Sequence, residues 1–208
     1  MTENAPLPGT NTDHDTPGRP LRADAQRNLD SLLEAAKAVF AISGVDAPAK
    51  EVADRAGVGV GTFYRHFPQR SDLVIAVLAH EIDDCADAAA ALSAEHDPWT
   101  ALVQWVQRYT ELVATKQGLA AALHSGGPAF KELLEYFWQR FGPAVGSLLY
   151  AAAANGDICG DVRAEDLLYS VACLCIPMGD AEVAYNQRMV SLLLDGLRYR
   201  ADPSPSRS

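Results

Sequence analysis

Residues 44–73 read GVDAPAKEVADRAGVGVGTFYRHFPQRSDL, and this stretch decides the fold of the first third of the chain. It predicts two short helices, at 48–56 and 62–66, separated by a turn that contains Gly57. Glycine ends a helix readily because it adopts left-handed backbone without strain. The first helix keeps small residues on one face, so the second can pack closely against it. The pattern is that of a helix-turn-helix, whose second helix presents its first residues to the major groove of DNA.

The second helix carries side chains suited to a DNA backbone and to base edges. Thr62 offers a hydroxyl and a methyl group, and Tyr64 offers a hydroxyl that can donate to a phosphate. Glycines at 59 and 61 let the backbone approach a phosphate closely. Phe63 and Phe67 are expected in the core. The candidate DNA-contacting residues are Lys50, Gly59, Val60, Gly61, Thr62, Tyr64, Arg65, His66 and Arg70.

The run from Ala56 to Leu73, A-G-V-x-x-G-T-F-Y-R-H-F-P-x-R-x-D-L, resembles the recognition segment of the tetracycline-repressor (TetR) family. The usual core of that segment is Gly-Thr-(Leu/Phe)-Tyr-x-(His/Tyr)-Phe. The resemblance implies a homodimer with a three-helix DNA-binding head and a divergent body that binds a small molecule. Three positions depart from the family pattern: Gly59 and Ala47 stand where a capping Ser or Thr is common, and Arg70 replaces the usual lysine.

The remaining chain predicts more helices and no sheet, because its apolar residues recur at spacings of three and four. The expected ranges are 21–42, 72–92 (capped by Ser71), 98–116, 119–125, 128–154, 163–177 and 181–199, which makes an all-α fold of about nine helices. We expect a flexible arm at 1–18, a helix-turn-helix DNA-binding domain at 19–72, a ligand-binding and dimerisation domain at 73–201, and a flexible tail at 202–208.

Candidate ligand-binding and dimer residues in the body rest on the resemblance and on side-chain chemistry. Aromatic residues four apart on two helices indicate an apolar pocket; the candidates are Trp105, Tyr109, Leu123, His124, Phe130, Phe137, Trp138, Phe141 and Cys173. The same aromatics also suit an ordinary core. For the dimer interface the candidates are Leu167, Val171, Leu174, Met189, Leu192, Leu193, Gly196 and Leu197, some of which must also fill the monomer core. The expected effector is a small hydrophobic molecule with one polar group that lies near His124.

Charge and composition narrow the function classes. The net charge is −10, but residues 18–72 hold eight basic and seven acidic side chains, so most of the acidic surplus lies in the body. A near-neutral head on an acidic body suits a protein that presents only its head to DNA. The four cysteines form no CxxC pair and follow no secretory signal, and no apolar run is long enough to span a bilayer. We therefore expect a cytoplasmic protein.

No enzyme signature is present. His80-Glu81 begins an HExxH-like pattern, but Asp84 stands where the second histidine is needed. Cys173 and Cys175 lie roughly 200° apart around a predicted helix and cannot share a metal ion. The sequence predicts neither metal nor cofactor. It favours a repressor that a small apolar ligand releases from its operator; the alternative is a helix-turn-helix protein whose body serves protein–protein contacts without an inducer.

Overall fold

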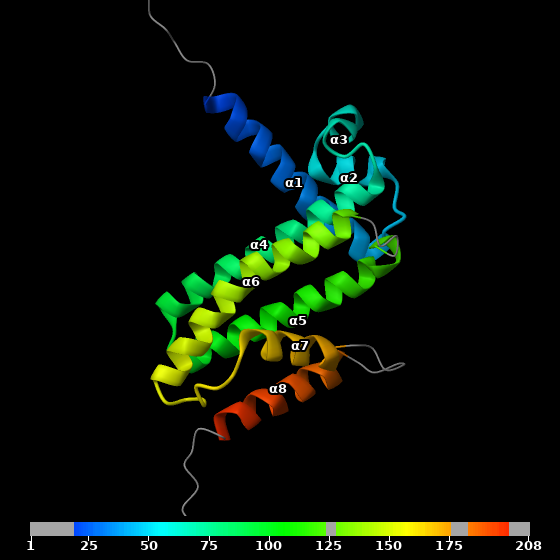
Figure 1. The fold of residues 1–208 in the computed structure, drawn as a ribbon. Coiled ribbons are helices and arrows are strands. Elements are labelled where there is room, and N and C mark those ends of the chain that lie inside the picture. Colours follow the sequence, from blue (N-terminus) through cyan, green and yellow to red (C-terminus); the bar gives the residue numbers. More distant parts are fainter. Residues whose placement is uncertain (1–18, 124–127, 176–182, 200–208) are drawn as a thin grey trace, which may run out of the picture.

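The computed structural model describes residues 19–123, 128–175 and 183–199, and these residues form helices without any β-strand (Figure 1). The all-α class predicted from the sequence is confirmed. In chain order the helices are α1 (Arg19–Ser43), α2 (Ala49–Ala56), α3 (Val60–His66), α4 (Arg70–Glu95), α5 (Pro98–Leu123), α6 (Pro128–Ala154), α7 (Ala164–Leu174) and α8 (Val183–Tyr199).

The described ranges hold eight helices, against the nine or so expected, because the break predicted near Gly118 is absent. Helix α5 runs through that glycine without interruption. A glycine inside a helix costs about 1 kcal/mol relative to alanine, which the packing of a 26-residue helix on its neighbours can offset. The two segments predicted at 98–116 and 119–125 are therefore one helix as far as Leu123, where the described range ends.

Helices α1–α3 and the first turns of α4 share one hydrophobic cluster. It is built around Leu32, Val39, Val52 and Phe63, all nearly inaccessible to water, and it extends into α4 as far as Leu78. Its residues recur at helical spacing on α1 and α4, so burying one face of each helix closes the cluster. This part of the chain, called the head below, lies at one end of the molecule (Figure 1).

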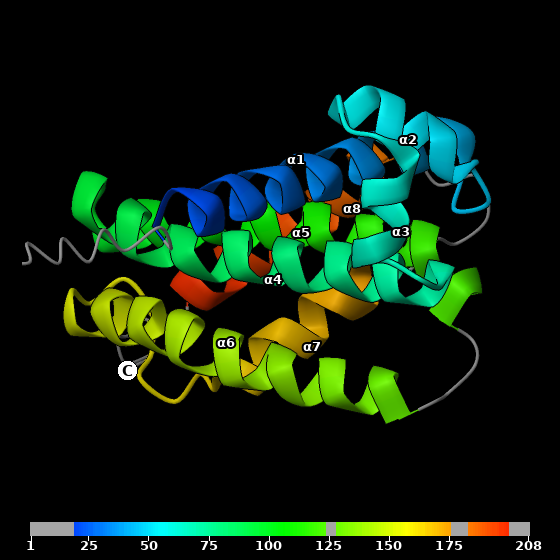
Figure 2. The ribbon, with the colours of Figure 1, turned by 90° about the horizontal axis from the view of Figure 1, so that it is seen from above.

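The second cluster lies among α4–α8 and is centred on Trp105 and Phe141, both fully buried. Helices α4, α5 and α6 pack along one another, and α7 and α8 cover α5 on the side away from α2 and α3 (Figure 1). Helix α1 crosses over α4 and contacts it, while the N-terminal half of α1 stands away from α4 (Figure 1); in the view from above the two helices overlap (Figure 2). The 26-residue α4 is thus common to the head and the body.

Two helix starts differ from the sequence expectation. Gln69, not Ser71, caps α4: the Gln69 backbone N–H donates to Asp72 Oδ2 at 2.9 Å, and the Gln69 side chain accepts from the backbone of Asp72. This reciprocal arrangement satisfies two N–H groups at the start of α4, where Ser71 is already the second residue of the helix. Helix α2 has Pro48 as its N-cap, while Ala47 is buried.

No helix among the described residues has the length and apolar character needed to cross a membrane.

Candidate functional site

The turn between α2 and α3 sets the direction of α3. Gly57 ends α2 with φ +71°, a left-handed conformation that glycine adopts at little cost. The Val58 backbone N–H donates back to the Ala53 carbonyl at 3.0 Å, so the chain reverses within three residues. Phe63 and Phe67 then anchor α3 in the head cluster, with ring centroids 5.8 Å apart, as the sequence indicated.

The opposite face of α3 is exposed. Tyr64 is 55% accessible and stands edge-on to Phe63, which holds its ring at the surface, whereas Thr62 is half-buried. A Cβ placed on Gly59 or Gly61 meets no atom within 4 Å, so the backbone at the start of α3 is open to an incoming group. The exposed candidates on this face are Gly59, Val60, Gly61, Tyr64, Arg65 and His66.

The two flanking cations have partners within the head. Lys50 Nζ lies 2.5 Å from Asp54 Oδ2 on the same exposed surface of α2, so part of its charge is compensated. Arg70 Nη2 donates to the Ala47 carbonyl at 2.5 Å, which ties the first residue of α4 to the loop before α2. A guanidinium has five donors, so this bond leaves others for a phosphate. Arg70 therefore also positions the helix-turn-helix, a role that the sequence did not indicate.

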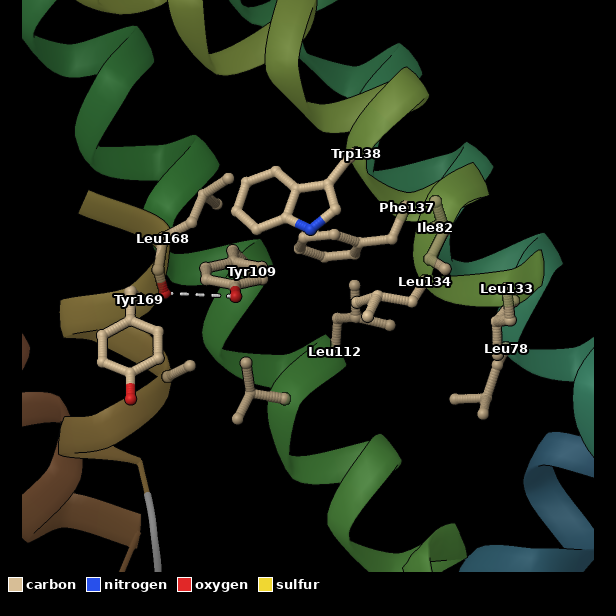
Figure 3. A pocket seen from close by; sticks show the side chains of 12 residues that line it. Leu78, Ile82, Tyr109, Leu112, Leu133, Leu134, Phe137, Trp138, Leu168 and Tyr169 are labelled. Carbon is tan, nitrogen blue, oxygen red and sulfur yellow. Dashed lines mark hydrogen bonds between the residues drawn. The ribbon is translucent and has the colours of Figure 1, made fainter. Parts of the chain in front are cut away.

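A cavity of about 410 Å³ lies in the body between α4, α5, α6 and α7 (Figure 3). Its wall is almost entirely apolar and includes no charged side chain among the described residues. The lining residues are Leu78, Ile82, Tyr109, Leu112, Val113, Leu133, Leu134, Phe137, Trp138, Leu168, Tyr169 and Ala172. A cavity of this size and character is typical of a site for a small apolar molecule.

Three aromatic side chains supply the polar groups of the wall. Tyr109 Oη donates to the Leu168 carbonyl at 3.2 Å, and burial raises the pKa of Tyr109, so the hydroxyl stays neutral. Its oxygen keeps acceptor capacity toward the cavity. The indole nitrogen of Trp138 faces the cavity, and Tyr169 stands at its edge (Figure 3). The wall thus offers hydroxyl and N–H groups but no counter-charge.

Of the predicted ligand-binding residues, Tyr109, Phe137 and Trp138 line this cavity. Trp105 and Phe141 instead lie behind the wall, fully buried: Trp105 stacks on Tyr109, and its Nε1 donates to the Cys85 carbonyl at 2.8 Å. Cys173 is exposed and outside the wall. His124 and the side chains of Leu123 and Phe130 lie outside the residues that the structure describes.

The lining residues that sequence reasoning missed are mostly aliphatic. Helical spacing places Leu78 with Ile82, Leu133 with Phe137, and Leu168 with Ala172 on single helix faces. That spacing was visible in the sequence, but leucines lining a cavity have the same pattern as leucines filling a core. Only the arrangement of four helices distinguishes the two.

The cavity wall borders the head. Leu78 belongs to the head cluster and also lines the cavity, and Leu133 packs against both clusters. One turn along α4, Glu81 points to α1, where Lys37 Nζ lies 2.6 Å from Glu81 Oε1. Among the residues whose exposure is described, Glu81 is the one charged residue that is buried. A shift of α4 at the cavity therefore disturbs its packing on α1.

A polar network holds α6 against α4 beside the cavity. Arg140 donates from Nε to Asp83 at 2.5 Å and from Nη2 to Asp87 at 2.7 Å, and Tyr136 also donates to Asp83. The hydrogen bonds to Asp87 and Asp83 raise the pKa of Arg140, and the bond to Asp83 raises that of Tyr136. The network fixes the half of α6 that carries Phe137 and Trp138.

The predicted dimer residues divide between two environments. Leu167 and Val171 are buried in the monomer core, and Leu174, Met189, Leu193 and Leu197 are half-buried. Leu192 is 63% accessible and Gly196 is exposed with open space at its Cβ position. The outer face of α7 and α8 also exposes Tyr169, Cys173 and Tyr185, which the sequence did not single out for this role.

An exposed helix-turn-helix on an all-helical body with an apolar cavity defines a class of DNA-binding regulators. The family model "Bacterial regulatory proteins, tetR family" matches residues 32–77, and "Transcriptional regulator SbtR-like, C-terminal domain" matches residues 97–199. The chain belongs to the TetR family of transcriptional regulators.

Solved structures of similar proteins cover nearly the whole fold. The TetR transcriptional regulator SCO0520 from Streptomyces coelicolor is 34% identical, with a TM-score of 0.70 over 82% of this chain and 98% of that one. The TetR transcription regulatory protein from Mycobacterium vanbaalenii is 35% identical, with a TM-score of 0.69 over 86% and 99%.

Similarity to curated proteins is confined to a shorter segment. An HTH-type transcriptional regulator of Staphylococcus aureus (strain USA300) is 36% identical over 64 residues, which are 30% of this chain. The chain spans about a third (35%) of the length of this relative.

Proposed function

We propose that this regulator binds an operator as a homodimer through α3 and is released by a small, neutral, mainly apolar ligand in the body cavity. The exposed surface of α3 around Tyr64 carries the DNA-binding part of the proposal. Phe63 and Phe67 already fill the core beneath this surface, so Tyr64 and its exposed neighbours are not needed for packing within the head. A regulator of genomic DNA acts in the cytoplasm, and its chemistry is binding rather than catalysis.

The cavity supports the ligand-release part and disfavours a body that serves only protein–protein contacts. The cavity is open to solvent, since its lining residues Leu134, Trp138 and Tyr169 are exposed, so its apolar wall stays in contact with water unless a ligand enters. The wall has no charge to balance an ionised ligand, so a neutral molecule fits best. Tyr109 and Trp138 supply one acceptor and one donor, which suits a ligand with a single hydroxyl or carbonyl group.

The route from cavity to DNA runs through α4. Leu78 lies in both the cavity wall and the head cluster, so a ligand that displaces it changes how the head packs. If the ligand prefers the non-binding arrangement by roughly 3 kcal/mol, operator affinity falls by about two orders of magnitude.

The exposed face of α7 and α8 supports the dimer. Leu192, Tyr169 and Tyr185 present apolar area on adjacent helices without cover from the described part of the chain. A two-fold partner that buries this face brings two copies of α3 to successive major grooves, roughly 34–36 Å apart.

Selection of genomic DNA fragments by the purified protein tests the proposal. Wild type is expected to enrich a short palindrome, and Tyr64→Ala is expected to lose it. Tyr150→Ala is the matched control, because Tyr150 is a tyrosine 78% exposed on the body helix α6. Enrichment of nothing by wild type, or equal loss with both variants, would rule out α3 as the reading surface.

A further inference from the structure

A cluster of three ionisable side chains bridges the head and the body, apart from the α3 surface and the cavity. His80 and Asp84 lie one turn apart on α4, and Glu34 faces them from α1. Residues at i and i+4 share one face of a helix, so both α4 side chains reach the same point. The candidate donor atoms of the three residues all lie within 4.8 Å of one another.

The distances in this cluster are too long for hydrogen bonds, fit a His–carboxylate ion pair, and also fit side chains that share one metal ion. His80 Nε2 lies 3.4 Å from Glu34 Oε1 and 3.6 Å from Asp84 Oδ2. An N–H···O hydrogen bond is typically about 2.7–3.2 Å long. Two N or O ligands of one tetrahedral Zn²⁺, each about 2.0–2.2 Å from the ion, stand about 3.3–3.6 Å apart. Both His80 distances fall in or next to that interval.

The charge balance is a second observation that favours a cation. Glu34 and Asp84 carry two negative charges around a single imidazole, and the ion pairs found in the described ranges give neither carboxylate a lysine or arginine. Two cations on the helices around the cluster have other partners: Lys37 pairs with Glu81, and Arg140 pairs with Asp83 and Asp87 on another side of α4. Imidazole with two carboxylates is a ligand set that zinc accepts.

From this geometry we propose that Glu34, His80 and Asp84 form a binding site for a divalent transition-metal ion of the Zn²⁺ class, which cross-links α1 to α4. His80 is the most enclosed of the three, with 23% of its side chain exposed, while both carboxylates are 58% exposed. Because both carboxylates are exposed, water would complete the ligand set. The ion ties the first helix of the head to the helix that lines the cavity.

The sequence alone did not indicate this site. His80 and Asp84 were set aside because a zinc-protease motif needs a second histidine at position 84, but a carboxylate there also binds zinc. The third ligand comes from a different helix, Glu34 on α1, and only the packing of α1 on α4 brings it close.

Calorimetric titration of the untagged, full-length protein with ZnCl₂ at pH 7.5 tests the proposal. We expect one Zn²⁺ per chain at this site, with affinity lowered by about tenfold or more in each of His80→Ala, Glu34→Gln and Asp84→Asn, since even outer-shell losses reach that size. His96→Ala is the matched control, because His96 is an exposed histidine at the other end of α4. Zinc affinity unchanged in His80→Ala, or lost equally in His96→Ala, would overturn the proposal.

A second measurement tests whether the ion joins α1 to α4 or is bound by the two α4 residues alone. Zinc is expected to slow amide hydrogen exchange in α1 of wild type, and Glu34→Gln is expected to abolish that protection while keeping the fold. Cobalt substitution is expected to give the visible absorption of a tetrahedral N/O site without a thiolate charge-transfer band. A thiolate band would place the ion on cysteine and refute the assignment.

Discussion

Replacing Lys37 by methionine should show how much the ion pair between Lys37 on α1 and the buried Glu81 on α4 contributes to the free energy of unfolding. Lys37→Met keeps the length of the side chain and removes the ammonium group 2.6 Å from Glu81. The Glu81 side chain is only 10% exposed, so its carboxylate then stays in the α1–α4 interface without a partner. Breaking a fully buried pair costs about 3–5 kcal/mol.

The expected loss is smaller than that limit because water reaches the pair from the lysine side. The Lys37 side chain is 41% exposed, and solvent screening reduces the penalty to about 2 kcal/mol. For a chain of this length each kcal/mol lowers Tm by about 2–4 °C, so Lys37→Met should lower it by about 6 °C. Adding Glu81→Gln should recover much of the loss, because no buried charge then remains.

Urea denaturation at fixed protein concentration measures the change in free energy and thermal unfolding measures the change in Tm, with Lys50→Met as the matched control. Lys50 pairs with Asp54 at a similar distance, 2.5 Å, but both side chains are exposed, 76% and 63%. That pair should contribute less than about 0.5 kcal/mol. Equal losses in Lys37→Met and Lys50→Met, or no recovery with Glu81→Gln, would show that burial of Glu81 does not control this interface.

Three further predictions follow from the body. Trp105→Ala should lower the free energy of unfolding by about 4 kcal/mol in urea, since it empties the centre of the larger cluster, whereas half-buried Trp99→Ala should cost clearly less. Burial raises the pKa of Cys85 from 9.0 to about 12, so above pH 9 the unfolded chain loses a proton that the folded chain keeps. The free energy of unfolding should then fall by up to about 1.4 kcal/mol per pH unit between pH 9 and 12, and less steeply in Cys85→Ala; equal slopes would refute this. Leu192→Glu should convert a dimer to monomers in sedimentation experiments, and an unchanged mass would place the interface elsewhere.

The head was predictable because its sequence contains residues with few alternative explanations. Gly57 sits where the backbone is left-handed, Phe63 and Phe67 alternate with exposed side chains, and their spacing leaves one arrangement for α2 and α3. Helix starts were harder to predict: Ser71 has cap chemistry, but Gln69, two residues earlier, forms the reciprocal cap with Asp72. The second function of Arg70, bonding the Ala47 carbonyl, depends on a contact across the fold.

The body was predictable in class but only partly in detail. Aromatic spacing pointed to Tyr109, Phe137 and Trp138, which do line the cavity, but it could not separate them from Trp105 and Phe141 behind the wall. All five residues are large and aromatic and lie on helices. Whether a given one lines the cavity or packs behind the wall depends on how its helix is oriented toward the neighbouring helices. The same ambiguity placed Leu167 and Val171 among the dimer candidates although the monomer core buries them.

The central claim is that an occupied cavity and a bound operator exclude each other. Its most direct test is operator affinity, by fluorescence anisotropy, with and without a neutral aromatic alcohol or ketone already shown to quench Trp138. Wild type should lose about a hundredfold in affinity for DNA. Ala172→Trp, which fills the cavity from α7, should bind the operator but change less than about twofold when the compound is added. An operator affinity that stays constant while the compound occupies the cavity, or an equal loss in both proteins, would contradict the account.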